Sequence, residues 1–188
     1  MESVVDTMTI GFENFENGLS FWTTDTWVQD TRFARSGNYS VNQNSDESMA
    51  PGMNESIETT LDLSSSNSAE LRFWRKHYFR RNLDVGYVEI STNDGESWQQ
   101  LAEPFTGNKT KFAESVISLR AYCGPGADDV RIRFRAQADS SDGAKRGLFI
   151  DDVLIREGET VDVAFNSVPK DIPAEFRLEQ NYPNPFNP

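Results

Sequence analysis

Thiol and imidazole groups are almost absent from this 188-residue sequence, which has one cysteine, Cys123, and one histidine, His77. A lone cysteine cannot form an internal disulfide, and no metal-ligand spacing surrounds it, so we interpret Cys123 as a small apolar filler. A catalytic triad requires a base, and His77 lies in an arginine-rich run that disfavours its protonation. We therefore expect His77 to be a polar strand residue and the chain to be no enzyme.

Long apolar runs and a surplus of basic residues are also missing. No window is long and apolar enough for a membrane-spanning helix, so we expect no membrane insertion. The formal net charge of -12 would repel nucleic acid and anionic membranes, and we expect no nucleic-acid partner. Hydrophobic residues nevertheless make up 37% of the chain and aromatic residues 12%, which indicates one folded domain with a substantial core.

Helical periodicity is missing as well, and short runs of alternating apolar and polar residues take its place. In residues 130–136 (VRIRFRA) three arginines alternate with apolar side chains, and residues 71–79, 86–91 and 149–155 follow related patterns. The Asn-Asp-Gly of residues 93–95 predicts a hairpin. These patterns predict an all-β fold, a two-sheet antiparallel β-sandwich with jelly-roll (galactose-binding-like) topology.

Prolines gather at the end of the chain, in the run NYPNPFNP of residues 181–188. They exclude a helix and indicate a junction. The run resembles the opening of the C-terminal sorting domain that the type IX secretion machinery reads. The resemblance implies that machinery as a partner and an extracellular or cell-surface location. We predict a jelly-roll domain over 1–156, a linker over 157–172 and the truncated start of a sorting domain over 173–188.

Five motifs resemble, in type and in order, those of jelly-roll accessory domains related to the MAM family. They are GFENFENGLSFW (11–22), RSGNYS (35–40), LRFW (71–74), GYVEIS (86–91) and FIDDV (149–153). The resemblance extends to the cleaved-adhesin modules of secreted proteases, and several carbohydrate-binding modules share the architecture. It implies a non-catalytic module whose parent protein can be a secreted hydrolase such as a protease.

This resemblance also implies a structural calcium ion. Calcium binds six to eight oxygen atoms, and the first and last strands of a jelly roll should lie side by side. Similar domains hold the metal with an acid of the opening motif, oxygens at the Ser-Gly turn and an acid of the closing strand. The ligands implied here are Glu13, Ser36, Gly37, Asp151 and Asp152, with Arg35 as a further source of backbone oxygen.

Two points about this acidic site stay open at the level of sequence. Ile150 and Val153 cannot both face the core of a regular strand without a bulge. Which of Asp151 and Asp152 turns inward is therefore left open. Glu13 and Asp152 are alternatively solvated acids, or Asp152 pairs with an arginine.

A polar, aromatic sheet face is the second candidate site. If the strands share a sheet, one face collects rings that stack on sugars and arginines that bind carboxylates. The candidate ligand-binding residues are Arg72, Trp74, Lys76, Tyr78, Tyr87, Arg131, Arg133 and Arg135. The alternative is a network in which these arginines pair with Glu70, Glu89 and Glu114, or a docked neighbouring domain.

The function that these features predict is that of a non-catalytic extracellular accessory module. Its partners would be neighbouring domains of the parent protein or a surface protein, in an adhesive or structural contact. The alternative is a carbohydrate-binding module that binds glycans with the Arg/Trp/Tyr sheet face.

Overall fold

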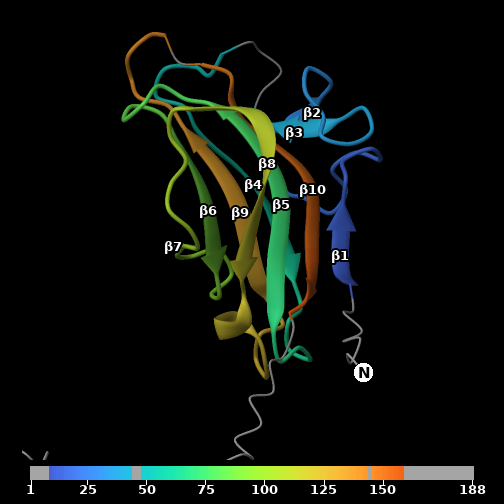
Figure 1. Ribbon diagram of the computed structural model, residues 1–188. Coiled ribbons are helices and arrows are strands. Elements are labelled where there is room, and N and C mark those ends of the chain that lie inside the picture. Colours follow the sequence, from blue (N-terminus) through green and yellow to red (C-terminus); the bar gives the residue numbers. More distant parts are fainter. Residues whose placement is uncertain (1–8, 44–47, 144, 159–188) are drawn as a thin grey trace, which may run out of the picture.

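The computed structural model describes residues 9–43, 48–143 and 145–158 and consists of two antiparallel sheets packed face to face (Figure 1). The only helix among the described residues is the 3-10 turn η1 (Arg120–Tyr122). The strands are β1 (Thr9–Glu13), β2 (Val28–Asp30), β3 (Ser40–Asn42), β4 (Asn54–Leu61), β5 (Ala69–Tyr78), β6 (Val85–Ser91), β7 (Gln99–Gln100), β8 (Asn108–Ser118), β9 (Val130–Gln137) and β10 (Gly147–Glu157). The predicted β-sandwich with jelly-roll architecture is confirmed.

The six-stranded sheet has the order β2-β3-β10-β5-β8, and β1 also pairs with β10. The four-stranded sheet has the order β4-β9-β6-β7. As expected, the first and last strands lie side by side, with Glu13 opposite Val153. The predicted hairpin is also present, because β6 pairs with β7 across a turn in which Asp94 and Gly95 have φ of 57° and 81°. Because β1 pairs with β10, the beginning and the end of the described chain lie next to each other.

The core lies between the sheets and follows from the alternation along the strands. On β9, Val130, Ile132 and Phe134 are buried, while the arginines between them are only half-buried. On β5, Leu71 and Phe73 face the same core. Removing this apolar surface from water is the main force that holds the two layers together. Cys123 packs half-buried against the core, in agreement with its interpretation as a filler.

A β-bulge interrupts the last strand. The pairing of β10 with β5 shifts between Asp151 and Leu154, and Asp152 has a φ of 44°. The extra residue allows both Ile150 and Val153 to reach the core, where they are 0% and 3% exposed. The bulge that the sequence required for both residues to be core is thus present.

The described sandwich extends slightly beyond the predicted domain end. β10 includes Glu157, and the backbone N–H of Gly158 donates to Ser68 O at 2.9 Å. The rest of the predicted linker and the predicted sorting-domain segment of residues 173–188 lie outside the described residues. No helix in the described ranges has the length and hydropathy to cross a bilayer.

Candidate functional site

The bulge of β10 turns two carboxylates toward the Ser-Gly turn. Asp151 Oδ2 accepts hydrogen bonds from the backbone N–H groups of Arg35 at 2.6 Å and Ser36 at 3.3 Å. Asp152 accepts from Ser36 Oγ at 2.7 Å and from Arg35 Nη1 at 2.9 Å. Three of the predicted metal ligands, Ser36, Asp151 and Asp152, are therefore neighbours. Asp152 also forms the arginine pair that the sequence left open as an alternative.

The other two predicted ligands, Glu13 and Gly37, have different partners. Glu13 Oε1 accepts from the backbone N–H of Phe15 at 2.6 Å. A Cβ on Gly37, whose φ is 58°, would lie 2.5 Å from the carboxylate of Glu16. Glu16 Oε1 in turn accepts the N–H groups of Asn38 and Tyr39 at 2.9 and 2.8 Å. Glu16, which we did not predict, therefore also binds this turn.

The electrostatics of the aspartate pair indicate an excess of negative charge. Burial raises the pKa of Asp151 to about 6, and the negative charge of Asp152 also raises it. Hydrogen bonds from the backbone N–H groups of the turn act in the opposite direction. Among the described residues, one guanidinium, that of Arg35, faces these two buried carboxylates. The oxygen donors have the chemistry that calcium prefers. No group of three or more His, Cys, Asp or Glu side chains suited to a metal occurs in the described ranges, so Glu13 does not join the pair in such a group.

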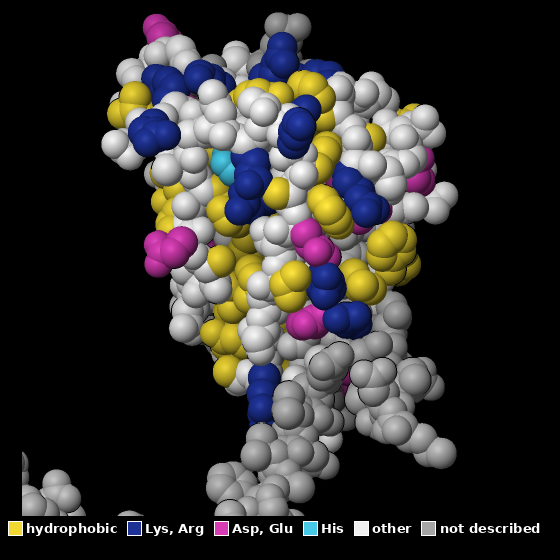
Figure 2. Space-filling model, in the orientation of Figure 1, with side chains coloured by type: hydrophobic (Ala, Val, Ile, Leu, Met, Phe, Trp, Pro, Cys, Tyr) yellow, Lys and Arg dark blue, Asp and Glu magenta, His cyan; other side chains and the backbone are white. Residues whose placement is uncertain are grey.

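The outer face of the six-stranded sheet carries four of the predicted ligand-binding residues. Arg72, Trp74, Lys76 and Tyr78 alternate with core-facing residues on β5 and are all half-buried. Figure 2 shows this side of the molecule, where basic, acidic and hydrophobic side chains are interspersed. The ring of Phe33, from the β2–β3 connection, joins them, because Lys76 Nζ lies 3.3 Å from its centroid.

The other four predicted residues lie on the opposite side of the sandwich, which corrects the prediction of one shared face. Tyr87 is on β6, and Arg131, Arg133 and Arg135 are on β9, both in the four-stranded sheet. Alternation along a strand tells which residues share a side, but it does not tell which strands share a sheet. The basic residues are therefore divided between two outer faces.

Both outer faces are networks of paired charges, as the alternative interpretation held. Glu89 is 5% exposed and accepts from Arg133 Nε at 2.6 Å and from Arg135 Nη2 at 2.7 Å. Burial opposes the charge of Glu89, but the hydrogen bonds from Arg135 and Arg133 prevail and hold the pKa of its carboxyl below the usual value. On the other sheet, Arg72 pairs with Glu70 and Glu114 at 3.2 and 2.7 Å.

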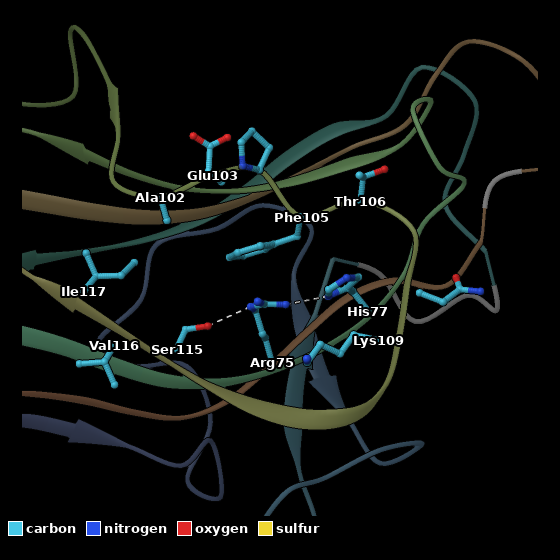
Figure 3. A pocket seen from close by; sticks show the side chains of 12 residues that line it. Arg75, His77, Ala102, Glu103, Phe105, Thr106, Lys109, Ser115, Val116 and Ile117 are labelled. Carbon is cyan, nitrogen blue, oxygen red and sulfur yellow. Dashed lines mark hydrogen bonds between the residues drawn. The ribbon is translucent and has the colours of Figure 1, made fainter.

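A cavity of about 590 Å³ lies between the β7–β8 connection and the neighbouring strands β5 and β8 (Figure 3). Arg75 and His77 line it from β5, on the side of the strand that also carries core residues. The guanidinium of Arg75 donates from Nε to Ser115 Oγ at 2.9 Å and lies 3.9 Å from the ring centroid of Phe105. The sequence could have indicated these two polar residues on the inner side of the strand. In the alternation of residues 71–79, positions 75 and 77 interrupt a series that is otherwise apolar.

His77 is a buried, neutral member of this cavity wall. Burial first, then the positive charges of Arg75 and Lys109, lower its pKa to about 4, against a hydrogen bond to the backbone of Thr106. Arg75 Nη1 lies 3.3 Å from His77 Nδ1. Because a guanidinium can only donate, Nδ1 must be the acceptor and the ring proton must be on Nε2. We expected the arginine-rich strand to disfavour protonation of His77, and the lowered pKa agrees, although burial rather than charge is its largest cause.

Comparison with known proteins gives relatives of this fold. No family model matches the chain. Bacillopeptidase F of Bacillus subtilis (strain 168) is 30% identical over 128 residues, which make up 66% of this chain. The chain spans only 8% of the length of this curated relative.

Solved structures similar to this chain include a cleaved adhesin domain and a xylan-binding domain. The K3 cleaved adhesin domain of Lys-gingipain from Porphyromonas gingivalis W83 has a TM-score of 0.59 and 16% identity, over 80% of this chain and 99% of that one. The CBM22-1 xylan-binding domain of Paenibacillus barcinonensis Xyn10C has a TM-score of 0.57 and 12% identity, over 80% and 94% of the two chains. At these identities the likeness establishes the β-sandwich fold. The structural neighbours thus include both cleaved adhesin domains and carbohydrate-binding modules.

Proposed function

We propose that this chain is a non-catalytic extracellular accessory module that makes adhesive or interdomain contacts with protein. The outer face of the six-stranded sheet is the main support. There Lys76 lies over the ring of Phe33, the guanidinium of Arg35 lies 4.4 Å from the ring of Trp74, and Arg72 pairs with acids. Arginine and aromatic side chains are the residue types enriched at protein interfaces. The likeness in fold to cleaved adhesin domains agrees with this function.

A carbohydrate-binding module is the second candidate, supported by the likeness to xylan-binding domains. Sugars bind to open ring faces, yet each candidate ring here has a cation over it. Arg35 lies over Trp74 at 4.4 Å, and Arg135 lies over Tyr87 at 4.0 Å. A sugar would have to displace a guanidinium from these rings. The outer faces therefore favour protein contact over sugar stacking.

A structural calcium ion is a further part of the proposal. Asp151, Asp152 and the Ser36 hydroxyl would hold the ion, together with backbone oxygens of the turn. The ion would neutralise the two buried carboxylates that one guanidinium now faces. Bound there, it would link the turn of residues 35–37 to the last strand and stabilise the native state.

Export by the type IX machinery completes the proposed setting. The run NYPNPFNP at the end of the sequence supports it through its resemblance to the start of a sorting domain. The module would then act outside the cell beside a neighbouring domain of its parent protein, such as a secreted hydrolase.

The test compares binding of the wild type and two double variants to immobilised extracellular-matrix proteins and to a neutral glycan array. Trp74→Ala/Tyr78→Ala alters the proposed face. The matched control is Tyr87→Ala/Trp98→Ala, since Tyr87 is on β6 of the other sheet and Trp98, just before β7, has Arg133 of that sheet over its ring. We expect protein binding to be lost in the first variant and kept in the second. Loss of neutral glycan binding in the first variant would instead support the carbohydrate-binding alternative. Equal protein binding by all three would contradict the assigned face.

A further inference from the structure

The cavity shown in Figure 3 contains a half-buried cation whose contacts are all with neutral groups. Arg75 contacts the hydroxyl of Ser115, the neutral ring of His77 and the ring of Phe105. No ion pair joins it to an acid anywhere in the described part of the chain. By contrast, Arg72, on the outer side of the same strand, pairs with two carboxylates. Because removing a charge from water is unfavourable without a counter-charge, Arg75 stands out as a group that lacks its natural partner.

The neutral contacts hold the guanidinium in one orientation. Ser115 Oγ accepts from Nε, and His77 Nδ1 accepts from Nη1. The Phe105 ring lies against the guanidinium and also stacks with His77 at 5.9 Å between centroids. These three contacts leave Nη2 without a described protein acceptor. A fork fixed in this way loses little freedom when it binds a planar anion.

The rest of the lining divides into a basic, polar end and an apolar end. Lys109 adds a second positive charge beside His77, and residues with hydroxyl and amide groups also line this end. Glu103 is the one acid in the lining, and in Figure 3 its carboxylate points away from Arg75. The basic and polar residues are Arg75, His77, Thr106, Asn108, Lys109 and Ser115, and the apolar end is formed by Ala102, Pro104 and Ile117.

We infer that this cavity binds the carboxylate of an acidic sugar, a uronic acid unit of an anionic glycan. Arg75 would bind the carboxylate as a fork, and Lys109 would add a second charge. The hydroxyl and amide groups would bind ring hydroxyls, and the apolar end would contact the carbon face of the sugar. The volume of about 590 Å³ lies within the range of small-ligand sites, about 300–1,000 Å³. This inference builds on the carbohydrate-binding candidate but uses a site separate from both outer faces.

The experiment measures binding of two trisaccharides that differ mainly in their carboxylates, trigalacturonate and galactotriose. Titration calorimetry gives the affinity, and the NMR signals of His77, the single histidine, report occupation of the cavity in the wild type. We expect trigalacturonate to bind and to shift these signals, and galactotriose to do neither. Arg75→Gln should weaken trigalacturonate binding by about tenfold or more, as expected for loss of a charged hydrogen bond. Lys109→Gln, an exposed position, should weaken it less and keeps the test valid if Arg75→Gln folds poorly.

Arg120→Gln is the matched control, because it removes an exposed positive charge that is not part of the cavity lining. It should bind trigalacturonate as the wild type does. Equal binding of both trisaccharides, or equal weakening by Arg120→Gln, would overturn the inference. So would binding of a glutamate-rich peptide with His77 shifts when trigalacturonate gives none, since the partner would then be a protein. The variant Trp74→Ala/Tyr78→Ala should keep trigalacturonate binding, so failure of the cavity and failure of the outer face are distinguishable.

Discussion

Glu89 is a residue whose loss of charge should strongly destabilise the sandwich. The side chain of Glu89 is 6% exposed, and Nε of Arg133 and of Arg135 lie 2.6 and 2.9 Å from its Oε2. Glu89→Gln keeps the shape but leaves two guanidiniums facing each other across an amide. Breaking a buried charge pair costs about 3–5 kcal/mol, and we take about 3 kcal/mol because both arginines keep some contact with water. The midpoint of thermal unfolding should fall by about 6–12 °C.

Urea unfolding at pH 7, followed by circular dichroism, measures this change. Glu114→Gln is the control, because Glu114 pairs with Arg72 on the exposed face of the other sheet and should lose less than about 1 kcal/mol. The pKa of Glu89 in the folded chain is below its ordinary value of 4.5, so its contribution is full above pH 4.5 and declines as the pH falls through the folded pKa. The difference between wild type and Glu89→Gln should therefore shrink in acid. A loss no larger than the control, or one independent of pH, would refute the reasoning.

Two further results are expected. An NMR titration of His77 should give a pKa near 4, because burial and the charges of Arg75 and Lys109 oppose protonation; since the unfolded chain takes up this proton near pH 6.5, stability should decline from there toward pH 4. A measured pKa near 6.5 would mean that the ring is exposed. Calcium at about one hundred times its dissociation constant should raise the melting temperature by about 5–10 °C over EDTA, and Asp152→Ala should abolish the rise. An unchanged melt of the wild type would remove calcium from the proposal.

The strands and their core-facing sides were predictable from the sequence. In β9 the period of two is unbroken, so burial of Val130, Ile132 and Phe134 follows directly from it. The sequence also showed that a bulge is needed if both Ile150 and Val153 are core residues, because only an extra residue lets both side chains face the core. Such inferences succeed because they depend on neighbours along the chain.

The pairing of strands distant in sequence was not predictable, and the candidate sites suffered from this. Nothing local to β5 or β9 indicates that they belong to different sheets, so the predicted single face was wrong. Glu16 was missed for the same reason, since its partners Asn38 and Tyr39 are in another segment of the chain. Arg75 was missed for a different reason. Its position in the alternation assigns it to the inner side of β5, whereas the candidate residues of this strand were all taken from the outer side.

The conformation of Asp152 shows how the fold joins its early and late segments. A residue other than glycine is rarely found at positive φ, although aspartate tolerates this better than most. At this position the conformation turns the carboxylate toward Arg35 and Ser36, more than one hundred residues earlier in the chain. A glycine would adopt the same backbone with less strain but would lose both of these contacts. The bulge therefore does more than keep the core in register. It also brings two acids to the turn of residues 35–37, and any cation bound there, whether the arginine alone or calcium as well, ties the first third of the module to its last strand.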